Sequence, residues 1–168
     1  MTPLLLATLA LAQSPPTTVE GVTVTAPRAQ AQVTATYPAQ GAAIAFGVLV
    51  LSVTFDQPMD PAGADRALGG PDAPRCLPTW RLLADAKTYV VLCSTDPGKS
   101  YKLRFGADPA RALQSAQHRP AAPYELAFTT ADDRTDASLA DALRSAGRKP
   151  EEGPVMDWRA AGASAPAR

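Results

Sequence analysis

The chain has 168 residues, near the usual size of one domain, and its 17 prolines are about twice the average usage. Sixteen lysine and arginine residues balance sixteen aspartate and glutamate residues. A chain without net charge has no field that would draw it to nucleic acid or to an anionic membrane surface, so nucleic acid is not expected as a partner.

The first 12 residues are interpreted as a secretory signal peptide. An apolar run over residues 4–11 is followed by a small-x-small pattern that favours cleavage after Ala12. The run is too short to cross a bilayer, which takes about 20 helical residues, so no membrane-spanning segment is expected in the mature chain. The alternative, an internal hydrophobic helix, is disfavoured by Ser14-Pro15-Pro16. The protein is therefore expected in the periplasm or at the cell surface.

Residues 13–32 are expected to form a linker ahead of the folded domain. Within it, TTVEGVTVTAPR (17–28) is β-prone and similar to the energy-coupling box of TonB-dependent receptors, which adds a strand to the sheet of its partner. The chain is far too short for the barrel of such a receptor. The segment is either a linker or extra edge strand, or a docking segment for an envelope protein with Val22 and Val24 as contacts.

Residues 33–130 are expected to form an all-β domain. VTATY (33–37) is a short strand, and VLVLSVTF (48–55) places leucine, valine and phenylalanine on one face. YKLRFGA (101–107) and YELAFTT (124–130) show the same alternation, which is typical of half-buried strands. Several such strands separated by proline and glycine turns predict a sandwich of two sheets.

The two cysteines, Cys76 and Cys93, are predicted to form a disulfide. If residues 75–82 and 87–94 form a hairpin around LADA (83–86), Cys76 faces Cys93 and Trp80 faces Tyr89. An exported protein with an even number of cysteines usually oxidises them; the alternative is a pair of buried free thiols. Pro78 indicates that this strand is an edge strand or is bulged.

The order of motifs resembles that of SbsA-type bacterial Ig-like domains, which occur in envelope and surface proteins. The motifs are YPAQGAAI (37–44), LSVTFDQPMDP (51–61), TWRLLADAKTYVV (79–91), STDPGKSYKLRFGA (94–107) and ALQSAQHRPAAPYELAFTT (112–130). The resemblance implies an Ig-like antiparallel β-sandwich of about seven strands with a binding or structural role. It also implies that Phe55 and Met59 fill the core and that Asp60 caps a turn. One departure is QHRP (117–120), where such domains often carry Asp-x-x-Gly-Asn.

The competing hypothesis is a small periplasmic carrier of copper or calcium, because copper carriers have a similar sandwich and similar opening motifs. Asp56, Asp60 and Asp65 lack the spacing of a calcium loop, which needs ligands at alternate positions, a central glycine and a terminal glutamate. Copper sites need histidine and methionine donors, and the chain has one histidine, His118. No metal site and no cofactor are therefore predicted.

No enzyme signature is present in the sequence. There is no Gly-x-Ser-x-Gly elbow and no His-Glu-x-x-His, and DPGKSY (96–101) lacks the glycine spacing of a P-loop. That segment is better interpreted as a turn that leads Tyr101 into the next strand. A hydrolase would have to depend on Ser115 or His118, and nothing marks either as catalytic. The chain is not expected to be an enzyme.

Residues 131–168 are expected to form a flexible tail with one short helix over 136–147. Asp136 or Ser138 would cap this helix, and Gly147 would end it. The rest of the tail has the composition of a disordered segment, with two exceptions, Met156 and Trp158. These two side chains either pack weakly on the sandwich or form a short partner-binding motif.

Overall fold

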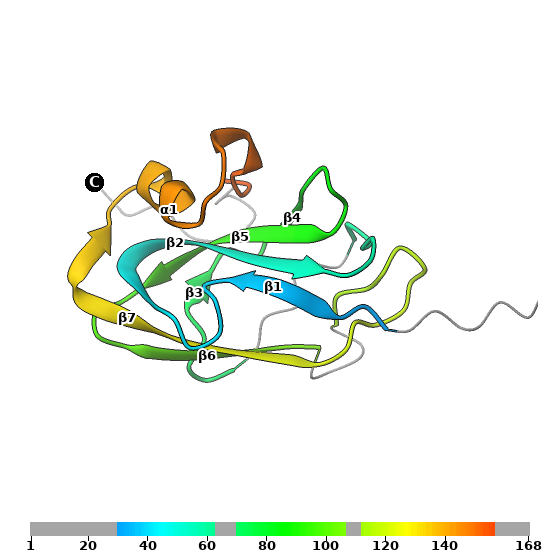
Figure 1. The fold of residues 1–168 in the computed structure, drawn as a ribbon, viewed down its shortest axis with the longest axis horizontal. Coiled ribbons are helices and arrows are strands. Elements are labelled where there is room, and N and C mark those ends of the chain that lie inside the picture. The colour runs from blue at the N-terminus through cyan, green and yellow to red at the C-terminus, as the bar shows by residue number, and fades with distance from the viewer. Residues whose placement is uncertain (1–29, 63–69, 107–111, 157–168) are drawn as a thin grey trace, which may run out of the picture.

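The computed structural model describes residues 30–62, 70–106 and 112–156 (Figure 1). It contains the strands β1 (Val33–Tyr37), β2 (Ala43–Phe55), β3 (Arg75–Cys76), β4 (Arg81–Leu82), β5 (Thr88–Thr95), β6 (Ser100–Phe105) and β7 (Tyr124–Asp136). The helix α1 (Leu139–Ser145) and the 3-10 helix η2 (Pro150–Glu152) follow. The predicted all-β, sandwich-like class is confirmed. None of the helices in the described ranges is long and apolar enough to cross a membrane.

The strands form one curled sheet in the order β3-β5-β2-β7-β6, with β1 beside β2 and β4 beside β5. The prediction that every pair is antiparallel is wrong for one pair, because β2 and β7 run parallel, with Ala43 opposite Thr129 and Gly47 opposite Asp136. A parallel pair needs a long connection, and here all the strands from β3 to β6 lie between the two partners. Hairpins join only neighbouring strands, and always antiparallel, so a prediction based on hairpins misses this parallel pair.

Gly47 is the residue at which β2 changes partners. Before Gly47 the strand pairs with β7, and from Gly47 onward it pairs with β5. The residue has φ +104°, and a Cβ built there would lie 2.6 Å from the backbone oxygen of Asp136. Only glycine fits this backbone angle and this close approach. The second half of β2 can therefore belong to one layer of the sandwich while its first half belongs to the other.

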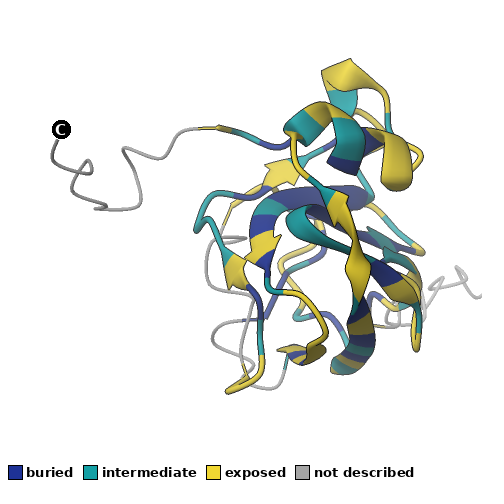
Figure 2. Cartoon of the chain, turned by 90° about the vertical axis from the view of Figure 1, so that its left-hand side faces the viewer, coloured by how far each residue is buried: buried dark blue, intermediate teal, exposed yellow. Residues whose placement is uncertain are grey.

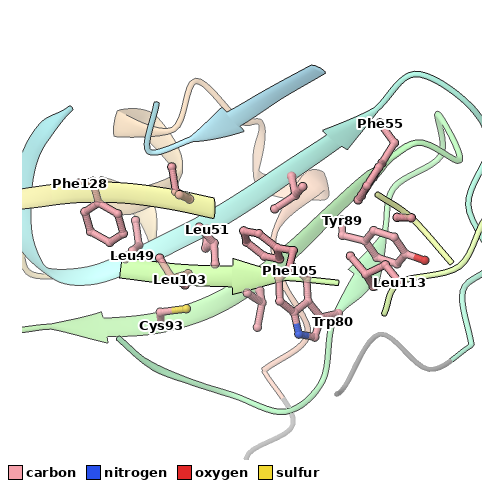
Figure 3. Close-up of a cluster of buried hydrophobic side chains, with 14 of the residues drawn as sticks. Leu49, Leu51, Phe55, Trp80, Tyr89, Cys93, Leu103, Phe105, Leu113 and Phe128 are labelled. Atoms are coloured by element: carbon pink, nitrogen blue, oxygen red, sulfur yellow. The ribbon is translucent and has the colours of Figure 1, made fainter. Parts of the chain in front are cut away.

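The core fills the space between the two layers, as the alternation predicted. Leu51 and Phe55 of β2, Leu103 of β6 and Phe128 of β7 all belong to this core, and each is at most 2% exposed (Figure 3). Met59 is also 2% exposed and lies in this core, as the resemblance implied. Trp80 extends this core through edge-to-face contacts, with its ring centroid 6.2 Å from that of Tyr89 and 6.3 Å from that of Phe105.

The predicted hairpin is correct at one end and shifted at the other. Cys76 lies opposite Cys93, and the two form a disulfide. The prediction that Trp80 faces Tyr89 is wrong, because Leu82 occupies that position. The strand is interrupted between β3 and β4 around Pro78, which has no N–H to donate to the ladder, and the register shifts by two residues there.

An additional layer covers the outer face of β2 and β5 (Figures 1 and 2). Ser138 caps α1 by accepting a hydrogen bond from the Asp141 N–H at 3.2 Å, and Gly147, with φ +62°, follows the end of the helix. The helix thus lies inside the range 136–147 in which one was expected. It buries Ala142 and Leu143 against Val50, Leu83 and Val90.

The tail after the helix is not free, contrary to the expectation from its composition. Gly153 and Pro154 are buried, and the carbonyl of Gly153 accepts a hydrogen bond of 2.7 Å from the guanidinium of Arg81. The physical reason is that Val50 and Val90 make the outer face of the sheet apolar, and an apolar face must be covered. We call residues 137–156 the C-terminal cover. The folded part of the chain therefore extends well past residue 130.

Candidate interaction surface

The acidic stretch that follows β2 ends the strand and holds the next loop. The carboxylate of Asp56 accepts a hydrogen bond of 2.9 Å from the Gln32 N–H, and that of Asp60 accepts one of 2.9 Å from the Ala62 N–H. Asp60 also contacts Nδ1 of His118 at 2.9 Å. In the described ranges no three His, Cys, Asp or Glu side chains are grouped so that they could hold a metal ion, and Asp65 lies outside those ranges.

Ser115 and His118 belong to the tight turn that Asp60 contacts. Ser115 is 1% exposed, and its hydroxyl accepts a hydrogen bond of 3.4 Å from the Arg119 N–H. The His118 side chain is 77% exposed, and its backbone adopts φ +57°, in the left-handed region that is common in tight turns. A hydroxyl that is buried and bound within its own turn is not open to a substrate. The geometry of both residues is that of a turn.

Tyr89 connects this loop to the core. It is fully buried, and its hydroxyl donates a hydrogen bond to the backbone carbonyl of Asp60. Burial, and next to it the charge of Asp60, raises the pKa of Tyr89 to about 12. The phenol therefore remains a neutral donor at every physiological pH and keeps the acidic stretch in place.

A polar hollow of about 330 Å³ lies where β5 ends, between residues 71–75 and the turn before β6. Asp96 lies in this hollow between two cations, 3.2 Å from the guanidinium of Arg75 and 2.9 Å from the ammonium of Lys99. The hydrogen bond to Lys99, then the charges of Lys99 and Arg75, lower the pKa of Asp96. Both cations are directed to this carboxylate, and Asp72 also lines the hollow, so two carboxylates balance two cations and the hollow has no net charge to offer a ligand.

A larger, apolar groove of about 600 Å³ lies on the C-terminal cover. We call it the α1 groove; it is lined by Leu139, Ala140, Leu143, Arg144, Arg148 and Pro150. Its two arginines belong to local ion pairs, Arg144 with Asp141 at 3.0 Å and Arg148 with Glu152 at 3.7 Å. Apolar side chains with charged groups at the rim are suited to bind a hydrophobic side chain of a peptide.

The same face of the sheet has a second hollow, of about 350 Å³, beside the disulfide. Val48, Leu77 and Leu92 contribute its aliphatic side chains, and all three are only partly buried. The C-terminal cover therefore leaves a strip of apolar sheet surface open. Partly covered apolar strips of this kind are typical of interaction surfaces.

Met156 is the exposed large hydrophobic residue of the described ranges, with 54% of its surface open to solvent. It follows the buried pair Gly153 and Pro154, so an ordered segment presents it. Of the residues predicted to bind a partner, Met156 is the one that the structure describes; Val22, Val24 and Trp158 lie outside the described ranges.

The α1 groove was not predicted from the sequence, although a signal for it is present. In the first half of the run VLVLSVTF both faces are apolar, because Val48 and Val50 occupy outward positions; Ser52 and Thr54 make the outward positions polar only in the second half. A strand that is apolar on both faces is typical of a sheet covered on both sides. With that pattern recognised, the pair Leu139 and Leu143 becomes the natural candidate for the cover.

No protein-family model matches the sequence, and no curated protein matches it. Among solved structures, surface layer protein SbsC (domains 1–6) has a TM-score of 0.44 and 17% identity, covering 61% of this chain and 14% of that one. CopC from Methylosinus trichosporium OB3b also has a TM-score of 0.44, with 13% identity, covering 61% of this chain and 94% of that one. Likenesses this weak support no statement about function. The resemblance to SbsA-type domains is supported only as a sandwich-like arrangement of strands.

Proposed function

We propose that the chain is an exported, non-catalytic binding module of the cell envelope, which contacts a partner protein through its C-terminal cover. The observation that carries this proposal is Met156, which is more than half exposed at the end of an ordered, packed segment. Methionine is polarisable and adapts its shape, and for this reason it is common at binding surfaces. Leaving it in water costs free energy that contact with a partner would recover.

Export is supported by the disulfide between Cys76 and Cys93. Disulfides persist in oxidising compartments such as the periplasm and the cell surface, and are rare in the cytosol. The apolar run at residues 4–11, which lies outside the described ranges, agrees with this location.

A binding role is favoured over catalysis because the side chains that could act in catalysis are already bonded within turns of the fold. The hydroxyl of Ser115 is buried, the carboxylate of Asp60 is bonded to a backbone N–H, and His118 contacts that same carboxylate. Each group stabilises a turn. In contrast, the hollow beside the disulfide is apolar and open, which suits a hydrophobic side chain of a partner.

Photo-crosslinking in cells tests the proposal. A photoreactive residue replaces Met156, and the matched control places it at Gln117, which is also exposed but lies in the turn after Ser115. We expect one abundant envelope protein in the adducts from position 156 and none from position 117. Equal adducts from both positions, or none from position 156, would refute a binding role for the C-terminal cover. With a third probe at Val24, adducts from that position alone would move the docking site to the N-terminal segment.

A further inference from the structure

The α1 groove has the chemistry of a site for one aromatic side chain. Leu143 forms its floor and is buried, Leu139 is half-buried, and Ala140 and Pro150 are exposed on its walls. The Arg144 side chain is 75% exposed and borders the groove, so a ring in the groove could stack on its planar guanidinium. Arginine above an apolar floor favours an aromatic ring, and tryptophan most of all.

The chain carries a tryptophan within reach of this groove. Gly153 lies against Leu143, since a Cβ built on Gly153 would be 3.8 Å from Cδ1 of that leucine. Trp158 follows Gly153 by five positions (158 minus 153). An extended chain of that length spans up to about 17 Å, so the segment is long enough to bring the indole to the groove. A short connection of this kind also gives a local concentration of the order of millimolar.

The composition of the segment identifies the side chain that would dock. Residues 157–168 read DWRAAGASAPAR, in which Trp158 is the one large hydrophobic residue. Met156 is not the occupant, because more than half of its surface is open to solvent. The carboxylate of Asp157 lies beside the indole in sequence and would be brought near the cationic rim formed by Arg144 and Arg148.

We propose that Trp158 docks in the α1 groove of its own chain, with the indole on Leu139 and Leu143 and its face against the guanidinium of Arg144. The docked tail would extend the C-terminal cover and fix Met156 at its edge. The inference concerns the face used by the proposed function, but its test contains no partner, so each of the two can fail without the other.

The experiment uses the full mature chain labelled with 5-fluorotryptophan and recorded by ¹⁹F NMR. The protein has two tryptophans, and the Trp158→Phe variant assigns their resonances. Ala140→Glu fills the groove and offers Arg144 an ion pair one helical turn away, so it competes with the indole without removing a core contact. Ala137→Glu is the matched control, since Ala137 is also exposed but does not line the groove.

We expect the Trp158 resonance to be displaced from its position in the urea-unfolded chain. It should return to that position in Ala140→Glu and stay displaced in Ala137→Glu, while the resonance of the buried Trp80 reports that both variants are folded. A Trp158 resonance already at the unfolded position overturns the proposal. So does a displaced resonance that Ala140→Glu leaves unchanged, and so does a displacement that disappears on dilution, because that would place the indole in a second copy.

Discussion

Replacing Leu143 by alanine tests whether the C-terminal cover is part of the fold. Leu143 is 6% exposed and packs on Val50 and Val90, each fully buried under it. Deleting a buried leucine side chain costs about 2 to 5 kcal/mol, and because this one lies in a layer of a single short helix that can partly collapse, we expect about 2 to 3 kcal/mol. At roughly 3 to 5 °C per kcal/mol for a domain of this size, Tm should fall by roughly 10 °C.

The assay is urea unfolding followed by far-UV circular dichroism. Leu139→Ala is the matched control: it removes the same atoms from the same helix at a half-buried position, so we expect it to cost about 1 kcal/mol or less. A change below about 0.5 kcal/mol for Leu143→Ala, the range of ordinary surface substitutions, would show that the helix does not cover the sheet in solution. Equal losses for the two variants would also contradict the packing described above.

Four further predictions follow from the geometry. Reducing the bond between Cys76 and Cys93, 17 residues apart, should lower the free energy of unfolding by about 3 kcal/mol, measured by urea midpoints with and without reductant; unchanged midpoints would contradict this. Gly47→Ala should cost at least about 2 kcal/mol, because its Cβ would meet backbone, whereas Gly41→Ala, with open space around it, should cost about 1 kcal/mol; equal thermal shifts would refute the account of the partner exchange in β2. Since burial raises the pKa of Tyr89 to about 12, the unfolded chain loses that proton near pH 10 before the native one does, so stability is full below pH 10 and should fall by up to about 2 kcal/mol as pH rises toward 12; a flat unfolding curve over this window would oppose it. Neither a chelator nor added copper or calcium should shift Tm, and a stoichiometric rise would instead support a metal carrier.

The strands of the core could be predicted because each one shows its burial in its own sequence. In β6, Tyr101, Leu103 and Phe105 alternate with exposed residues, and a period of two has one structural interpretation. The pairing of Cys76 with Cys93 could be predicted because a single turn connects the two strands that carry them. Local information is sufficient for features of this kind.

The parts that could not be predicted depend on segments that are distant in sequence. The parallel pairing of Gly47 with Asp136 brings together residues that no turn connects. To predict the change of register at Pro78, one would need to know how many residues the interruption of the strand takes up. The α1 groove requires both the outer face of β2 and a helix whose apolar stripe is too narrow for it to be stable alone. Each is a product of tertiary packing rather than of a local pattern.

The apolar outer face of the sheet explains why the candidate interaction surface lies on the C-terminal cover. A sandwich needs only its inner faces to be apolar, yet Val48, Val50 and Leu92 extend apolar character to the outer face, and the C-terminal cover buries only part of it. A sheet that faces water on one side carries polar residues there and needs no cover. The outer face and its cover therefore exceed what the fold requires, and this excess is the physical basis for placing the interaction surface on them.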